Sequence, residues 1–232
     1  MSKTYKYVEV ENPFENIDKE IYNKLIEYPY TFDKIIETVL NAAEEINEGL
    51  NPEYNPKYYW QGMPMKEGTN FGGMYEYKIR ENFNKIGEFT FIEGAHNTGE
   101  DLLCIENPKW SIELKTRKNL SFNNTNDSGR THESTKYNGT ENQEHYYILV
   151  QHDMYLDNIP YKTKPQRIFF GLLCKNDFTN PNGTGAAYLK SDIRIKKCIE
   201  IWNYQIGNTI DNYQAWLDNE YYEKMVELEN IL

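Results

Sequence analysis

The chain has 232 residues, of which 39% are hydrophobic and 26% charged, and its formal net charge is −11. This length suits a single domain, and no apolar run is long enough to cross a membrane or to act as an N-terminal signal. The three scattered cysteines, Cys104, Cys174 and Cys198, exclude a disulfide framework or a zinc site, so we expect reduced thiols and a cytoplasmic protein.

The charge is distributed unevenly along the chain. Residues 1–108 are net −10 and residues 201–232 are net −5, whereas residues 109–200 carry 14 lysines and arginines against 10 acidic residues. Attraction to phosphate depends on the local potential and not on the total charge, so this middle segment is the one expected to approach a nucleic acid. An acidic protein that mimics nucleic acid is the alternative, but the basic middle segment counts against it.

Apolar residues at helical spacing predict three helices in the N-terminal part. The first spans residues 14–28 and ends before Pro29, the second begins at a Thr31 cap, and the third spans residues 73–86. A loop rich in proline, glycine and tyrosine lies between the last two helices, at residues 51–70. Long loops in compact domains often carry function, although packing through the aromatic residues explains this loop equally well.

Short apolar or alternating runs predict the strands of the remaining chain. They cover residues 89–92, 101–105, 109–116, 145–151 and 166–174. Residues 192–202 mix isoleucines with basic residues. A last helix is expected over residues 209–232, where it would serve packing or a dimer seam.

Two of these strands are predicted to form a hairpin around residues 106–108, whose Glu-Asn-Pro sequence favours a turn. The second strand alternates, so that Glu113 and Lys115 share the face opposite its apolar residues. If residue 107 is the centre of the turn, Asp101 lies opposite Glu113, with about 4.5–5.5 Å between their Cβ atoms. Two opposed carboxylates repel, and a hard cation such as Mg²⁺ between them would turn that repulsion into binding.

Asp101, followed twelve residues later by Glu113-Leu114-Lys115, resembles the D…ExK signature of the PD-(D/E)XK nuclease superfamily. Glu100 stands where the motif's name has proline, a residue that is often absent in the superfamily. The resemblance implies that Asp101 and Glu113 bind Mg²⁺, and the carbonyl of Leu114 is a further candidate ligand. It also implies that Lys115 orients or activates the attacking water.

A second ExK tripeptide, Glu76-Tyr77-Lys78, follows no strand–turn–strand pattern and belongs to the predicted third helix. Some members of the superfamily place a helix glutamate near the metal ion. Glu76 or Glu81 could take that part as an accessory acid. The alternative is an exposed helix carboxylate without such a role.

Residues 117–144 follow the catalytic strand and are almost wholly polar. Arginine and asparagine side chains read purine edges with two hydrogen bonds each, and lysine attracts phosphate. The segment therefore predicts DNA contacts, unless it is an insertion without function. Its candidate residues are Arg117, Lys118, Asn123, Asn124, Arg130 and Lys136.

The resemblance implies an α/β fold with a central mixed β-sheet flanked by helices, the restriction-endonuclease-like core. We expect one nuclease domain over residues 1–232. Its parts are an N-terminal helical and loop part (1–70), a catalytic core (71–175) and a C-terminal recognition and dimer part (176–232).

The implied function is Mg²⁺-dependent, site-specific cleavage of double-stranded DNA by a type II restriction endonuclease. Such enzymes usually act as homodimers, because two-fold protein symmetry matches a palindromic site. Two alternatives stay open: a DNA repair or recombination nuclease, and a non-catalytic DNA-binding module of the same fold.

Overall fold

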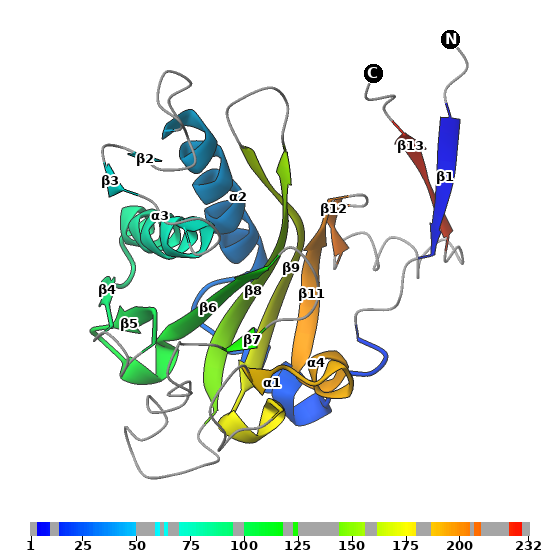
Figure 1. Cartoon of the computed structure of the whole chain (residues 1–232). Coiled ribbons are helices and arrows are strands. Elements are labelled where there is room, and N and C mark those ends of the chain that lie inside the picture. Colours follow the sequence, from blue (N-terminus) through cyan, green and yellow to red (C-terminus); the bar gives the residue numbers. More distant parts are fainter. Residues whose placement is uncertain are drawn as a thin grey trace.

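The computed structural model of the chain describes a set of segments that form helices and strands (Figure 1). These segments are residues 4–9, 14–49, 59–60, 63–64, 70–94, 100–117, 123–124, 144–155, 162–179, 187–204, 207–209 and 223–228.

A seven-stranded mixed sheet forms the centre of the fold, in the order β12-β11-β9-β8-β6-β5-β4. Its β6–β8 pair is parallel and its other pairs are antiparallel, which confirms the expected central mixed sheet. In chain order its strands are β4 (Phe91–Glu93), β5 (Leu102–Cys104), β6 (Ile112–Arg117), β8 (His145–Tyr155), β9 (Lys162–Leu173), β11 (Cys198–Asn203) and β12 (Gly207–Asn208).

Each face of the sheet carries its own hydrophobic core. On β8, Ile148 and Val150 belong to a large core shared with the N-terminal helices, whereas Tyr147 and Leu149 belong to a smaller one. This alternation follows from the two-residue repeat of a strand. We call these the large-core face and the small-core face. The small core consists of Tyr147, Leu149, Phe169, Leu173, Phe178, Leu189 and Cys198, with Ile193 packed against it.

The large-core face is covered by three helices: α1 (Lys19–Ile26), α2 (Phe32–Gly49) and α3 (Asn70–Ile86). The predicted first helix was too long, because the Asp18 carboxylate accepts from the backbone N–H of Glu20 at 2.8 Å and caps the helix there. Thr31 caps α2 as expected, through a 3.4 Å hydrogen bond from Lys34 N–H. Helix α3 ends before Gly87, which has the positive φ of 77° that favours glycine.

The small-core face is covered by the 3₁₀ helix η3 (Lys175–Asp177), strand β10 (Ala187–Tyr188) and helix α4 (Ser191–Lys197). A glycine allows close approach there: a Cβ at Gly171 would lie 2.4 Å from the Cys198 Sγ atom. All three cysteine thiols are free and buried. Strand β10 pairs with β7 (Asn123–Asn124) in a separate two-stranded sheet.

Two shorter pairings lie outside the central sheet. Strands β2 (Tyr59–Trp60) and β3 (Met63–Pro64) pair within the segment predicted as a loop. Strands β1 (Thr4–Glu9) and β13 (Glu223–Leu228) join the two ends of the chain. The predicted helix over residues 209–232 is therefore wrong at residues 223–228. Their Glu, Lys, Met and Leu residues favour a helix locally, but pairing with a distant strand overrides that preference.

The hairpin of β5 and β6 also differs from its prediction at one point. Residues 109 and 110 do not belong to the second strand, because Pro108–Trp110 form the 3₁₀ helix η1, capped by the Asn107 side chain. Strand β6 therefore begins at Ile112.

Among the helices that the structure describes, none is long and apolar enough to cross a membrane.

Candidate active site

The β5–β6 hairpin sets the register of the site. Leu102 pairs with Ile112, and the next position outward brings Asp101 opposite Glu113, as the sequence predicted. The turn is supported by side chains: Ser111 Oγ accepts from Cys104 N–H at 3.1 Å, and Asn107 Oδ1 accepts from Lys109 N–H at 3.2 Å. These local contacts hold the two carboxylates on neighbouring strands.

Asp101, Glu113 and Lys115 form one compact polar cluster. Lys115 Nζ donates to Glu113 Oε1 at 2.5 Å and to Asp101 Oδ2 at 3.3 Å. The backbone adds two bonds, from Leu114 N–H to Asp101 Oδ2 at 2.8 Å and from Asp101 N–H to Glu113 Oε2 at 3.3 Å. The side chains of the three residues are only 15–21% exposed, so their charges interact with little screening.

Burial and charge shift the proton affinities of this cluster. Burial, followed by the Asp101 carboxylate, raises the pKa of Glu113 to about 7, although Lys115 acts in the opposite direction. Burial alone would lower the pKa of Lys115, but the carboxylates of Asp101 and Glu113 outweigh it and raise that pKa. Lys115 therefore stays a cation, which can donate hydrogen bonds but cannot accept a proton.

Helix α3 brings a third carboxylate to the cluster. Burial raises the pKa of Glu76 to about 8. The negative charges of Asp101 and Glu113 add to this rise, whereas the positive charge of Lys115 opposes it. Glu76 is thus no isolated surface carboxylate. Glu81, the other acid considered, instead binds Lys78 at 2.7 Å. The sequence could place a glutamate on the helix but not choose between the two.

Two features of the site have no signal in the sequence. Glu100 Oε1 lies 2.6 Å from His145 Nδ1, so the residue before Asp101 is tied to the first residue of β8. Burial opposes ionisation of Glu100, but the bond with His145 outweighs it and lowers the pKa. Tyr147 pairs in register with Glu113, and burial followed by the Glu113 charge raises the pKa of its phenol. Both contacts depend on the β6–β8 pairing.

The chemistry of the donors suits a hard divalent cation. The carboxylates of Asp101 and Glu113 share the ammonium group of Lys115, and Glu76 is near enough for these charges to act on it. Burial first, and then the charge of Asp101, raises the pKa of both Glu113 and Glu76. Within the described residues, no three or more His, Cys, Asp or Glu side chains form a metal cage. Mg²⁺ fits such a site, because it retains waters and takes few protein ligands.

The predicted DNA-binding residues fall into two groups. Arg117 ends β6, directly after the cluster, and its partial burial lowers its pKa. Asn123 and Asn124 form β7, which pairs with β10. Lys118, Arg130 and Lys136 lie outside the described residues.

Comparison with known families gives one match. The sequence fits the model of the ScaI restriction endonuclease family over residues 5–202, which is most of the chain and includes the central sheet from β4 to Trp202 of β11. The protein belongs to the ScaI restriction endonuclease family. No curated protein and no solved structure matches this family member. Membership confirms the predicted class, a restriction endonuclease, and the matched segment contains Asp101, Glu113 and Lys115.

Proposed function

We propose that this member of the ScaI family is a type II restriction endonuclease that cuts double-stranded DNA at a specific site in a Mg²⁺-dependent reaction. We also propose that its site is of the PD-(D/E)XK type and that it acts as a homodimer. The observation that carries the proposal is the cluster itself, in which two opposed carboxylates share the ammonium group of Lys115.

Asp101 and Glu113 would hold Mg²⁺, with the carbonyl of Leu114 as a further ligand. When bound, the ion would supply positive charge against the oxygens of the scissile phosphate. The side chains fit this part because they are mostly buried and their backbone is fixed by the hairpin. A site on paired strands holds its groups more precisely than a site on a loop.

Lys115 would orient the attacking water and stabilise the charge that develops on the phosphate. Its raised pKa keeps the ammonium group protonated, so it acts as a hydrogen-bond donor and not as a base. Glu76 would act as an accessory acid. Its pKa of about 8 means that it exchanges a proton near neutral pH and responds to any charge placed at the cluster.

The test is digestion of a fully sequenced phage DNA with Mg²⁺, and again with EDTA. Discrete bands that appear only with Mg²⁺ support the proposal, and the fragment ends give the recognition site. A smear would indicate a non-specific nuclease. DNA that stays intact under all conditions, while branched or damaged DNA is cut, would favour a repair nuclease. Binding without any cleavage would overturn the catalytic proposal.

A matched pair of variants makes this test specific. Lys109→Ala removes an exposed lysine of the same hairpin, outside the cluster, and we expect it to keep the banding pattern. Asp101→Asn removes one charge from the cluster with little change of shape, and we expect it to lose the bands. Equal activity of the two variants would contradict the proposed site.

A further inference from the structure

A small basic surface lies over β9 and β11, on the small-core face of the sheet. It consists of β10 and α4 with their connection, residues 187–197. These residues carry four basic side chains against one acidic side chain, Asp192, in a chain whose net charge is −11. A local excess of positive charge attracts phosphate whatever the total charge of the protein. The basic residues are Lys190, Arg194, Lys196 and Lys197.

This surface and Lys115 lie on the same face of the sheet. Lys115, Leu149 and Phe169 are register partners across β6, β8 and β9, so their side chains share the small-core face. The guanidinium carbon of Arg194 lies 4.9 Å from the centre of the Phe169 ring. Lys115 on β6 is therefore two strand spacings, about 10 Å in all, from Phe169 on β9, which Arg194 of α4 covers.

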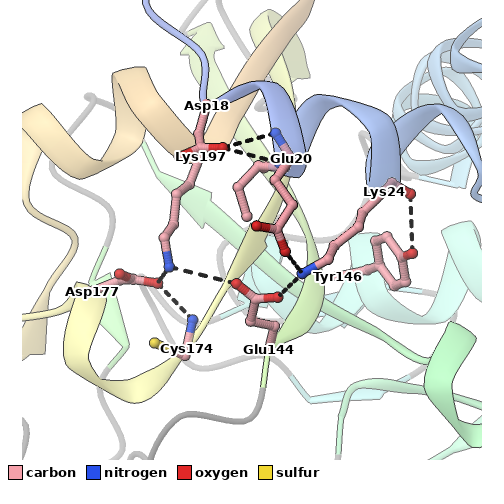
Figure 2. A network of polar contacts seen from close by, with 9 residues as sticks. Asp18, Glu20, Lys24, Glu144, Tyr146, Cys174, Asp177 and Lys197 are labelled. Atoms are coloured by element: carbon pink, nitrogen blue, oxygen red, sulfur yellow. Dashed lines mark hydrogen bonds and ion pairs between the residues drawn. The ribbon is translucent and has the colours of Figure 1, made fainter.

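Helix α4 is held firmly in this position (Figure 2). Lys197, its last residue, donates to Asp177 Oδ2 at 3.0 Å and lies 3.8 Å from Glu144 Oε1. The Asp18 backbone N–H, at the start of α1, donates to the Lys196 carbonyl at 2.8 Å. The charge of Lys197 is thus neutralised by acidic residues of the protein itself. These contacts anchor the C-terminal end of α4.

Two lysines of the surface, Lys190 and Lys196, keep their charge available. Lys190 and Lys196 are exposed. Lys190 Nζ donates to the neutral carbonyl of Asn176 at 2.9 Å, and within the described part of the chain neither lysine has an ion pair. Arg194 is half-buried against Phe169, which fixes its guanidinium group.

The same surface is joined to the polar segment that follows β6. Tyr188 of β10 pairs with Asn123 of β7, and its side chain is 43% exposed. The Tyr188 hydroxyl is also near enough to Arg117 to affect its pKa. Residues from two distant parts of the sequence therefore meet beside the end of the catalytic strand.

We propose that Lys190 and Lys196 bind the phosphate backbone of the DNA duplex whose scissile phosphate lies at Lys115. This inference rests on the proposed function. It adds a protein surface that binds the DNA backbone near the cleaved phosphate. Contacts to phosphate position a duplex and add affinity without reading bases. The surface should therefore act equally on all sequences, in contrast to residues that read the recognition site.

The test compares two double variants of equal charge. Lys190→Ala/Lys196→Ala removes the exposed lysines of the surface. Lys34→Ala/Lys85→Ala removes two lysines from α2 and α3, which cover the large-core face. Affinity for a labelled duplex is measured by fluorescence anisotropy in EDTA, over a series of salt concentrations. We use two unrelated duplex sequences and confirm by circular dichroism that each variant is folded.

We expect the slope of log affinity against log salt to fall by about 0.9 for each lost phosphate contact, and so by about 1.8 in the first variant. Its affinity should fall about tenfold on both duplexes, while the control keeps the wild-type slope. A second readout is cleavage: the first variant should show a raised KM and a kcat within about threefold of wild type, because Lys115 is untouched.

An unchanged slope in the surface variant, or an equal loss in the control, overturns the inference. If the double variant does not fold, the single Lys196→Gln variant carries the same test, with an expected loss of about 0.9 in slope. Failure of the proposed function looks different. A wild-type protein that binds DNA with a steep salt dependence but cuts none with Mg²⁺ would refute the nuclease proposal and leave the surface standing.

Discussion

Two regions of this protein place lysine between carboxylates, yet their physical character differs. In the cluster of β5 and β6, Lys115 meets Asp101 and Glu113, and all three side chains are 15–21% exposed. In the network of Figure 2, Lys24 lies 3.0 Å from Glu20 and 2.9 Å from Glu144, with side chains that are 39%, 79% and 28% exposed.

The difference lies in compensation and in screening. In the cluster, burial and then the charge of Asp101 raise the pKa of Glu76 and of Glu113, and Lys115 is the ammonium group that opposes this rise. In the network, Lys197 supplies a second ammonium group to Glu144, and water screens the rest. The first arrangement suits the Mg²⁺ site that we propose, whereas the second joins α1 and α4 to Glu144, the residue before β8.

The largest effect is expected on the rate of DNA cleavage, when Lys115 and Lys24 are each replaced by alanine in separate variants. Lys115→Ala should reduce cleavage by about 10²–10⁴-fold, because it removes a charge aimed at the reacting phosphate, and should leave the fold intact. Lys24→Ala should leave cleavage within about threefold and cost at most about 1 kcal/mol of stability. Single-turnover cleavage and chemical denaturation measure both; full activity of Lys115→Ala would remove the distinction between the regions.

Lys197→Ala should have the next largest effect, on stability. Asp177 is 7% exposed and accepts from Lys197 at 3.0 Å. Among the described residues, the variant leaves this buried carboxylate with one donor, the backbone N–H of Cys174. We expect a loss of about 1–3 kcal/mol in the free energy of unfolding, measured in urea. A loss of unfolding free energy as small as that of Lys24→Ala would mean that burial does not make the Lys197–Asp177 pair more important than the exposed pairs of Lys24.

Metal binding sharpens the comparison without any cleavage measurement. Mg²⁺ at tenfold over its dissociation constant should stabilise the wild-type protein by about 1.4 kcal/mol, seen as a rise in Tm. The rise should vanish in Asp101→Asn and persist in Lys24→Ala. An undiminished rise in Asp101→Asn would place the ion elsewhere.

The smallest effect is a pH dependence from Glu76. Its folded-state pKa of about 8 exceeds its ordinary value of 4.5, so the folded chain binds the extra proton, and the stability it brings is lost as the pH rises toward 8. Glu76→Gln cannot lose that proton. In the absence of metal it should match wild type near pH 4 and exceed its unfolding free energy by about 1 kcal/mol or more near pH 8.

This difference is measured by denaturation at several pH values, with Glu81→Gln as the matched helix control. The charges of Asp101, Lys115 and Glu113 act on Glu76, so the size of the gain reports on the whole cluster. If the gain in unfolding free energy of Glu76→Gln does not grow with pH, the cluster does not raise the pKa of the Glu76 carboxyl.

The division into parts at residues 70 and 175, the homodimer and the cytoplasmic location stay predictions. The choice of a type II enzyme within the restriction class awaits the digestion experiment. The predicted contacts of Lys118, Arg130 and Lys136 with DNA likewise await a complex.

The sequence alone determined the elements whose causes are local. The turn at Asn107 and the alternation of β6 are set by neighbouring residues, and so the opposition of Asp101 and Glu113 could be predicted. The same holds for α2, whose Thr31 cap and apolar spacing lie within a few residues of each other. The segment that would carry Glu76 was also visible as a helix.

Only the tertiary structure decided the contacts between distant segments. Pairing of β8 with β6 brings Tyr147 beside Glu113 and His145 to Glu100, and pairing of β7 with β10 brings Tyr188 beside Asn123. The strand at residues 223–228, predicted as helix, forms because β1 offers it a partner from the opposite end of the chain. Such pairings depend on which strands meet after the chain closes on itself, and no short stretch of sequence contains that information.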